Sequence, residues 1–489
     1  MKAPRPSFIF FCVLAAAGLA LASGTAEAAR ISELETSGTL ERAARFFSLQ
    51  DPSLRYALLG SLLLGLSCGL MGAFLVVRRL ALMSDALSHA VLPGVALGFL
   101  WNMTRDPVAI FIGAAICGLL GAGLTHAIRS TTRHKEDAAL GFVLAAFFSA
   151  GVCLLTMIQN RPGGNKSGLG TFMFGQAAAM GPADLTLLAI VAALAVGIIT
   201  IFYKELLLTS FDSAFARAAG LPATFIHALL MMLLAFAIVS ALQAVGVVLV
   251  SAMLVIPAAA AYLLTDRFAW MLGLSAALGM ASGAAGSFFS FVGKDLSTGP
   301  LIVLSAAAAF VLALLFAPRH GIVSKWRRQH SQAARIQREN TLKALYHVLE
   351  NGGFARDSVT MRELAEHRRE PLETIEQQLN SVRRAGLVSF QKDRGSAVFT
   401  PEGRQRAEEI VRNHRLWELY LTTAAQYADD HVHEDAEKIE HVLGEDAVRE
   451  LERQLNHAGL DPHGKPIPGS GGAPAPSESP QPPPPANPS

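Results

Sequence analysis

The chain has 489 residues, of which 52% are hydrophobic and only 16% are charged, and its formal net charge is +2. The charged residues concentrate after Pro318, so the composition excludes a single soluble globular domain and predicts a membrane domain followed by a soluble one. The four cysteines are Cys12, Cys68, Cys117 and Cys153. They lie in apolar stretches without CxxC spacing, so neither a disulfide framework nor a thiolate metal site is indicated.

The first 29 residues have the three-part pattern of a secretory signal peptide. Two basic residues precede an apolar run over residues 8–22, and small residues end the segment near Ala28. We favour cleavage near Ala28 over the alternative, an uncleaved first membrane helix, because the apolar run is barely long enough to span a bilayer. Residues 30–53 are then expected to form an extracytoplasmic linker.

A polytopic, all-α membrane domain is predicted over residues 54–318. The sequence contains apolar stretches over residues 54–77, 80–100, 107–128, 138–158, 184–203, 225–243, 245–264, 268–292 and 299–317. The two stretches beside Gly246 could be one broken passage, so we expect about eight or nine transmembrane helices.

Clusters of basic residues predict how these helices are oriented. Arg78 and Arg79 follow the first stretch, more basic residues lie within 129–135, and a basic linker is expected over residues 319–337. The positive-inside rule places these segments in the cytoplasm. The sequence therefore predicts a multi-pass protein of the inner (plasma) membrane, in contact with its lipid, whose C-terminal domain is cytoplasmic.

Asp85 and His89 are an acid and an imidazole four residues apart in an otherwise apolar run. On a helix this spacing places both side chains on one face, within reach of one ligand. Charged groups inside a bilayer are costly and usually face a protein interior or a water-filled path. Carboxylate and imidazole ligands suit zinc, manganese or ferrous iron. The alternative is a buried Asp–His hydrogen bond that holds two helices together.

A short amphipathic helix is expected within residues 204–222, on the cytoplasmic side by the same count. Phe211, Phe215 and Ala218 would share one side of it, and it would end at Gly220. Such a helix is either a simple connector or a surface on which another protein docks.

Four separated segments between residues 54 and 320 resemble the permease subunits of ABC importers for zinc, manganese and iron. They are LLGSLLLGLSCGLMGAFLVVRRLALMSDALSHAVLPGVALGF, SFDSAFARAAGLP, ALQAVGVVLVSAMLVIPAAAAYLLT and LLFAPRHG. The resemblance implies that Asp85 and His89 line the metal path. It also implies that residues 210–222 of this loop dock on the ATPase, and the residues expected to contribute are Phe211, Asp212, Phe215, Ala218 and Gly220.

The chain has no Walker A motif, so it is not expected to bind nucleotide or to be an enzyme by itself. The resemblance implies three partners: an ATP-binding cassette ATPase subunit, an extracytoplasmic metal-binding protein, and a second permease copy or paralogue. Alternating access would carry the ion past Asp85 and His89. An intramembrane hydrolase is disfavoured, since no nucleophile or HExxH motif accompanies the pair.

The pattern after residue 337 predicts a winged helix-turn-helix over residues 338–400. A helix over 336–350, a capping box at Thr360 that opens a second helix, a third helix over 372–384 and a β-hairpin of residues 388–391 and 397–400 follow in this order. The side chains expected to contact DNA, if this domain binds it, are Thr374, Gln378, Arg383 and Arg384.

The segment over residues 401–468 resembles the helical dimerisation and metal-binding region of the iron- and manganese-dependent repressors of the diphtheria toxin repressor family. That resemblance implies one metal site at Glu437, Glu440 and His441 and an ancillary site at His414, Glu418 and His433. Spacings of three and four also align the first set on one helical face. The Pro-rich tail, residues 469–489, is expected to be disordered.

Two departures from the repressor pattern leave the role of this domain open. Asn340 and Lys343 stand where the repressors place further metal ligands, and a lysine would repel a cation. Glu373 and Glu376 on the presumed recognition helix would weaken DNA binding. The chain is thus predicted to be a permease with a fused metal-responsive domain, or alternatively a membrane-tethered or proteolytically released regulator. Manganese, zinc and iron all remain open as substrate and effector.

Overall fold

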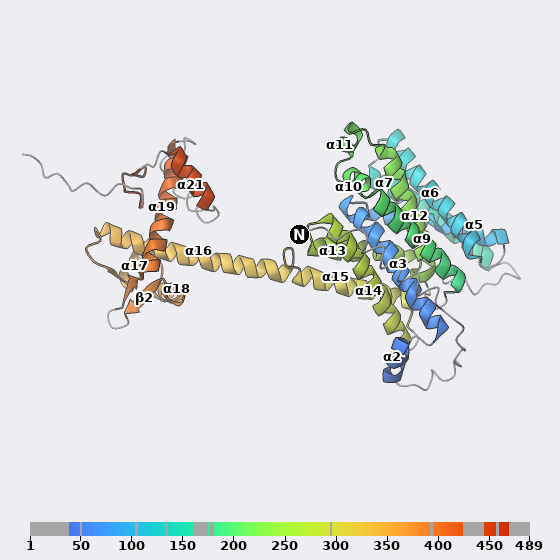
Figure 1. Cartoon of the computed structure of the whole chain (residues 1–489), viewed down its shortest axis with the longest axis horizontal. Coiled ribbons are helices and arrows are strands. Elements are labelled where there is room, and N and C mark those ends of the chain that lie inside the picture. Colours follow the sequence, from blue (N-terminus) through green and yellow to red (C-terminus); the bar gives the residue numbers. More distant parts are fainter. Residues whose placement is uncertain are drawn as a thin grey trace, which may run out of the picture. The chain divides into compact units, whose positions relative to one another are not determined.

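The computed structural model describes residues 39–48, 51–102, 106–133, 135–160, 175, 180–293, 296–391, 395–423, 445–455 and 459–468 (Figure 1). The chain divides into two compact units, Met1–Lys325 and Trp326–Ser489. The predicted signal peptide and the predicted Pro-rich tail lie outside the described residues.

The first unit is entirely helical in its described part. Its helices are α2 (Thr39–Ser48), α3 (Pro52–Val77), α4 (Ala81–Ala90), α5 (Leu92–Asn102), α6 (Pro107–Thr131), α7 (Glu136–Gln159), α9 (Pro182–Ile201), α10 (Tyr203–Phe211), α11 (Ser213–Ala218), α12 (Ala223–Val245), α13 (Val247–Leu264), α14 (Phe268–Val292) and α15 (Thr298–Phe316). Among the described residues, nine spans are long and apolar enough to cross a membrane, with α4 and α5 counted as one. This confirms the predicted all-α polytopic fold.

The two helices beside Gly246 count as separate spans. Gly246 has φ 87°, a left-handed conformation that an L side chain rarely adopts, and α12 ends directly before it. With α12 and α13 separate, the gaps after the first, third, fifth and ninth spans fall on the same side of a membrane. These gaps contain the three basic clusters and the 203–222 loop, so the count of spans agrees with the positive-inside rule.

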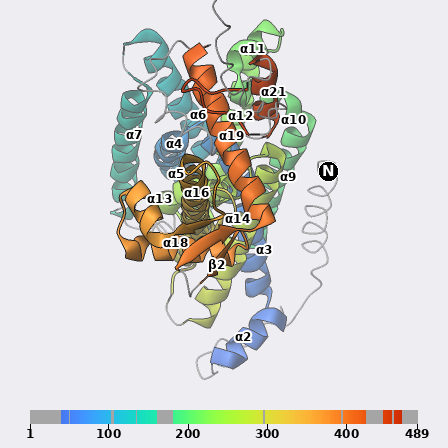
Figure 2. The same ribbon diagram turned by 90° about the vertical axis from the view of Figure 1, so that its left-hand side faces the viewer.

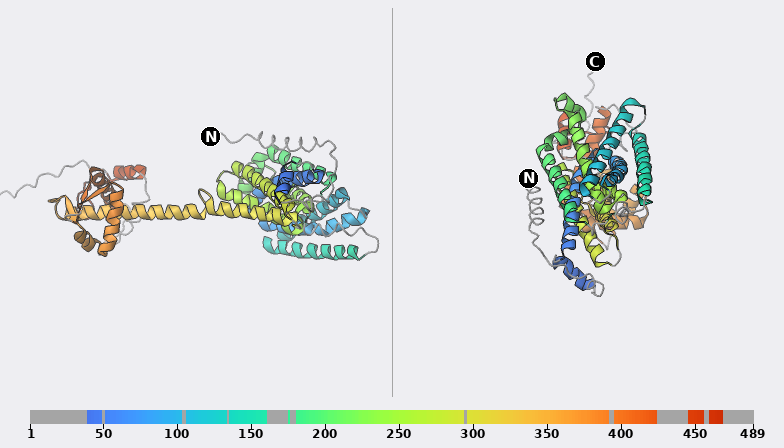
Figure 3. Two further views of the ribbon diagram at one scale, coloured as in Figure 1. Left: turned by 90° about the horizontal axis from the view of Figure 1, so that it is seen from below. Right: turned by 90° about the vertical axis from the view of Figure 1, so that its right-hand side faces the viewer.

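Helix α3 forms the centre of the membrane unit and packs most extensively against α14 (Figure 3). The two backbones approach closely where glycines face each other, since a Cβ added at Gly279 would lie 2.2 Å from the carbonyl oxygen of Gly65. One turn away, Ser275 Oγ donates a hydrogen bond of 2.6 Å to the carbonyl of Gly69. Small residues and hydroxyl bonds are the usual means of helix association in lipid, where the hydrophobic effect no longer favours contact.

The segment predicted as a polar linker contains helix α2, which packs on the end of α14 (Figure 2). Phe46 is buried against Phe288, with the ring centroids 5.1 Å apart. Arg42 Nη1 donates to the carbonyl of Val292 at 3.5 Å. The buried side of α2 thus carries Phe46 and Arg42, four residues apart on one helical face, whereas Phe47 is exposed.

The second unit has the order of a winged helix, followed by a long helix. Its elements are α16 (Ile322–Asn351, which begins in the first unit), β1 (Ser358–Thr360), α17 (Met361–Arg368), α18 (Leu372–Arg384), β2 (Val388–Gln391), β3 (Ser396–Phe399), α19 (Pro401–Thr423) and α21 (Glu445–Gln454). The strands form an antiparallel sheet in the order β1-β3-β2, with Ser358 opposite Val398 and Val388 opposite Phe399.

The predicted capping box is present at the start of α17. Glu363 N donates to Thr360 Oγ1 at 3.3 Å, and Thr360 N donates to Glu363 Oε2 at 2.9 Å. Helix α16 is longer than predicted and includes part of the expected basic linker, and the three-residue strand β1 was not predicted. A three-residue strand is too short to show an alternating pattern.

Candidate functional site

The Asp85–His89 pair lies on α4, in the span that is second from the N-terminal end of the membrane unit. His89 Nε2 is 3.8 Å from Asp85 Oδ1, and the two side chains are 16% and 41% exposed, respectively. Ala81 and Leu82 on the same face of α4 are exposed, whereas the rest of the helix packs against α6, α7, α12 and α13. The structure therefore brings the two predicted side chains together, half-buried, on the least buried face of α4.

One of the two ring nitrogens of His89 makes no hydrogen bond within the part of the chain that the structure describes. Its Nδ1 is buried and has no hydrogen-bond partner among the residues that the structure describes. The ring packs edge-on against Phe148 of α7, with the centroids 4.9 Å apart. A buried polar atom without a partner calls for a ligand such as water or an ion.

The hydrogen-bond ladder is interrupted beside the pair. Helix α4 ends at Ala90, α5 begins at Leu92, and Pro93 has no N–H with which to donate to the carbonyl of His89. The two helices count as one span, so the interruption is a local break beside His89.

The pair does not by itself complete a metal site. Within the ranges that the structure describes, no three or more His, Cys, Asp or Glu side chains are grouped to hold a metal ion. Two ligands suffice for a weak, exchangeable position, as a transported ion requires, and tighter coordination needs oxygen or nitrogen atoms from elsewhere.

The predicted coupling helix is divided in two. Asp212 ends α10 and caps α11, because its Oδ1 accepts hydrogen bonds from the backbone N–H groups of Ala214 (3.0 Å) and Phe215 (2.8 Å). Phe211 and Phe215 are 63% and 58% exposed, respectively. Ala218 and Gly220 are exposed as well, so the loop presents two aromatic rings on its surface.

Arg78 connects this loop with the central helix, a role that was not predicted. Its guanidinium follows the end of α3 and donates to Ser210 Oγ (2.9 Å) and Thr209 Oγ1 (3.0 Å) of α10 and to His227 Nδ1 (3.0 Å) of α12. Asp85 follows only seven residues after Arg78. The sequence indicated only a cytoplasmic basic pair, because long-range hydrogen bonds leave no periodic pattern.

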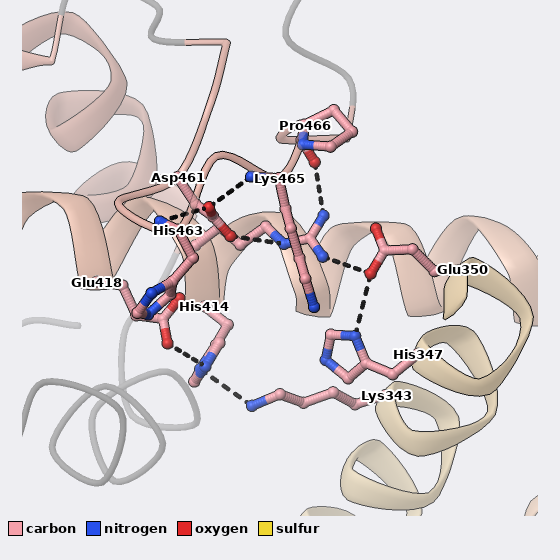
Figure 4. Close-up of polar contacts among 10 residues, drawn as sticks. Lys343, His347, Glu350, His414, Glu418, Asp461, His463, Lys465 and Pro466 are labelled. Atoms are coloured by element: carbon pink, nitrogen blue, oxygen red, sulfur yellow. Dashed lines mark hydrogen bonds and ion pairs between the residues drawn. The ribbon is translucent and has the colours of Figure 1, made fainter. Parts of the chain in front are cut away.

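The second unit contains a cavity of about 460 Å³ between α16, α19 and the segment 459–468 (Figure 4). Of the predicted ligands, His414 and Glu418 line it and are buried, with His414 Nε2 3.0 Å from Glu418 Oε1. Asn340 and Lys343 line it too, and Lys343 Nζ lies 3.0 Å from His414 Nδ1. The other predicted ligands, which are His433, Glu437, Glu440 and His441, lie outside the described residues.

Arg415 organises the wall of this cavity and was not predicted. Its side chain is fully buried, donates to Glu350 Oε2 (2.6 Å) and to the carbonyl of Pro466 (2.5 Å), and is paired with Asp461 at 3.4 Å. One signal was available, since position 415 follows the core residue Val411 by four and so falls on the buried face of α19.

The contacts of Glu350 in this network lower the pKa of its carboxyl group. Burial raises its pKa, but hydrogen bonds from His347 and Arg415 and the charge of Arg415 outweigh that effect and lower the pKa from 4.5 to about 2. A carboxyl whose folded-state pKa is depressed stabilises the folded state fully above its unfolded pKa. That stability is lost as the pH falls from about 4.5 towards 2.

We expect the second unit to lose roughly 1 to 2 kcal/mol of stability over this pH window, since solvent screens part of the charge. Urea unfolding followed by Trp417 fluorescence measures this in the full-length protein, once Trp101, Trp270 and Trp326 are replaced by Phe. Glu350→Gln should remove most of the pH dependence between 4.5 and 2. An unchanged slope in that variant would assign the dependence to other groups.

The residues predicted to contact DNA differ in their surroundings. Arg383 and Arg384 are exposed at the end of α18, and Thr374 is half-buried. Gln378 is buried, donates to Glu370 Oε2 at 2.5 Å and accepts from Thr341 Oγ1 at 3.5 Å. A DNA contact by Gln378 would require these bonds to break.

The nine apolar spans, the intramembrane acid–imidazole pair and the exposed loop define a multi-pass membrane transport protein with a winged-helix unit at its C-terminal end. The family model of the ABC 3 transport family matches residues 50–317. The chain belongs to this family. A second model, "Iron dependent repressor, metal binding and dimerisation domain", matches residues 400–469, so both predicted resemblances are confirmed.

Relatives and a solved structure share the membrane unit. The chain is 35% identical over 384 residues to the manganese transport system membrane protein MntC of Bacillus subtilis, which covers 78% of this chain and 87% of that protein. It is 38% identical over 286 residues to the zinc transport system membrane protein TroC of Treponema pallidum, covering 58% and 95%, respectively. The structure of PsaBC from Streptococcus pneumoniae in complex with Fab is similar with a TM-score of 0.52 and 36% identity, over 57% of this chain and 97% of that one.

Proposed function

We propose that this protein is the permease subunit of an ATP-driven importer of a divalent transition metal, with manganese and zinc as the first candidates and ferrous iron as the third. The observation that carries the proposal is the half-buried Asp85–His89 pair, with its buried, unpartnered Nδ1, inside an apolar span. The names of the relatives MntC and TroC support manganese and zinc, respectively.

The ion would pass the pair as a transient, incompletely coordinated cargo. Asp85 offsets the lost hydration with a full negative charge, while neutral His89 adds a softer ligand that disfavours magnesium and calcium. The exposed side of Asp85 is open to a second permease copy, and a symmetric partner would contribute a second acid and imidazole. Weak binding by each pair would let the ion leave again.

ATP hydrolysis is assigned to a separate subunit that docks on α10 and α11. Exposed Phe211 and Phe215 supply the apolar contact, and Arg78 transmits the displacement of α10 to the end of α3. An extracytoplasmic binding protein would deliver the ion to the opposite side. This arrangement places the protein in the inner membrane with the second unit in the cytoplasm, in agreement with the side on which the basic clusters fall.

For the second unit we propose a regulatory role, exerted through dimerisation, on the permease to which it is fused. The match to a repressor dimerisation domain supports it, and Glu437, Glu440, His441 and His433 stay predicted metal ligands. The exposed Arg383 and Arg384 favour one alternative, a membrane-tethered or released transcription factor. Binding of promoter DNA by the full-length protein would distinguish the two.

The proposed transport is tested by metal accumulation in cells that lack their own manganese, zinc and iron importers. With its ATPase and binding-protein partners co-expressed, the chain should raise accumulation of at least one of these metals about tenfold over cells with an empty vector. Omitting the ATPase subunit should abolish the gain. If none of the three metals accumulates while the protein is present in the membrane, the assignment fails.

A further inference from the structure

The ammonium group of Lys343 lies where the fused domain would hold a metal ion. The domain that matches residues 400–469 is described as metal-binding, and His414 and Glu418 are its predicted ligands within the described residues. Lys343 reaches this position from α16, on the opposite wall of the cavity (Figure 4). All three side chains are buried.

The three groups form a chain of polar contacts from cation to anion. An ammonium group has only donors, so at 3.0 Å Lys343 Nζ donates to His414 Nδ1, which must therefore be the unprotonated nitrogen. The proton of the neutral ring is then on Nε2, which lies 3.0 Å from Glu418 Oε1. The lone pair that a neutral imidazole would offer to a metal is thus directed at Lys343.

The residues around His414 do not fit a divalent ion. A metal bound to Nδ1 would take the place of Nζ and would be repelled by the ammonium group at short range. Among the residues that the structure describes, no three potential metal-binding side chains come together here or elsewhere. Positive charge is nevertheless present at the site, because the lysine supplies it.

We infer that Lys343 is a built-in cation that replaces metal at His414 and holds α16 against α19 in the absence of any bound ion. Two further ion pairs join the same helices, Arg415 with Glu350 at 2.6 Å and Arg406 with Glu339 at 2.9 Å. The domain thereby keeps at this position the arrangement that would otherwise depend on metal. The inference concerns the second unit alone, so it stands or falls independently of metal transport.

Hydrogen exchange of the full-length protein in detergent micelles tests this, with peptides that cover α19 and with manganese chloride as the probe. In the wild-type protein, manganese should change exchange in α19 by less than about twofold, because no site at His414 is available. Lys343→Asp replaces the cation with a ligand beside His414 and Glu418. In that variant saturating manganese should slow exchange in α19 by about tenfold or more.

The matched control is Lys465→Asp, which makes the same change of charge in the same cavity at a position without a contact to His414 in the described network. It should not create a response to manganese. Adding His414→Ala to Lys343→Asp should remove the response. A tenfold effect of manganese on wild-type α19 that His414→Ala abolishes would overturn the inference.

Two further variants cover the case in which Lys343→Asp fails to fold. Lys343→Met keeps most of the unbranched side chain but removes its charge, and it should accelerate metal-free exchange in α19 by about tenfold. Lys343→Arg keeps the charge and should stay within about twofold of the wild-type rate. Equal exchange in Lys343→Met and in the wild-type protein would show that the charge is not needed, and would also overturn the inference.

Discussion

Replacing Asp85 by alanine is expected to lower ATP-dependent metal uptake by about a hundredfold or more, because the ion loses the only full negative charge of the Asp85–His89 pair. Asp85→Asn should be nearly as defective, since an amide keeps the shape but not the charge. His89→Gln should be less severe and should change the ratio of manganese to magnesium transported, because it removes the softer ligand. Uptake of radioactive manganese and of magnesium into proteoliposomes with the ATPase subunit measures all three.

The matched control for this experiment is Asp137→Ala, which removes an exposed acid at the start of α7. It should transport at the wild-type rate. All variants should also have the same melting temperature in detergent, because Asp85 contributes little packing. If Asp85→Ala keeps wild-type uptake, the assignment of this pair to the transport path fails.

Replacing Arg78 by alanine is expected to uncouple ATP hydrolysis from transport. The guanidinium makes three hydrogen bonds that join the end of α3 to α10 and α12. Each bond of this charged kind contributes about 1.5 to 3 kcal/mol, so uptake should fall about tenfold or more. ATPase activity should persist in the assembled complex, because the exposed docking side chains Phe211 and Phe215 are unchanged.

Its neighbour Arg79 provides the control. Arg79 is exposed and has φ 59°, so asparagine, which tolerates this conformation, is the suitable replacement. Arg79→Asn should leave the ratio of metal transported to ATP hydrolysed unchanged. If Arg78→Ala keeps that same ratio, the hydrogen bonds between α10 and the end of α3 contribute to stability alone. If the Arg78→Ala protein no longer assembles with the ATPase subunit, Arg78 contributes to docking and not to coupling.

The parts of the fold that sequence predicted best are those with periodic apolar patterns or local hydrogen bonds. Helix α18 begins at Leu372 and ends at Arg384 as predicted, and the capping box at Thr360 depends on residues only three apart. Four separated segments were enough to identify the permease family. In contrast, the contacts of Arg78 join residues about 130 and 150 positions apart, and no local pattern encodes them.

The candidate sites likewise contain contacts that a local sequence pattern predicts and contacts between distant residues that it does not predict. The spacing of Asp85 and His89 predicted their proximity, because a helix alone determines it. The resemblance to the repressors implied that His414 and Glu418 share a site, but the partner of His414 comes from another helix. Sequence comparison predicted that Lys343 would repel a metal, whereas only the three-dimensional arrangement shows that its ammonium group contacts the imidazole.

Helix α16 begins in the membrane unit and ends in the second unit, so one polypeptide carries a transport domain and a dimerisation domain in a fixed one-to-one ratio. A separately encoded regulator must find its target by diffusion, and its effect varies with its expression level. Where two permease copies pair, the tethered domains instead meet at an effective concentration on the order of 1 mM. Even a weak dimerisation surface would then be occupied, and a regulatory response of the proposed kind could not be diluted by synthesis of more transporter.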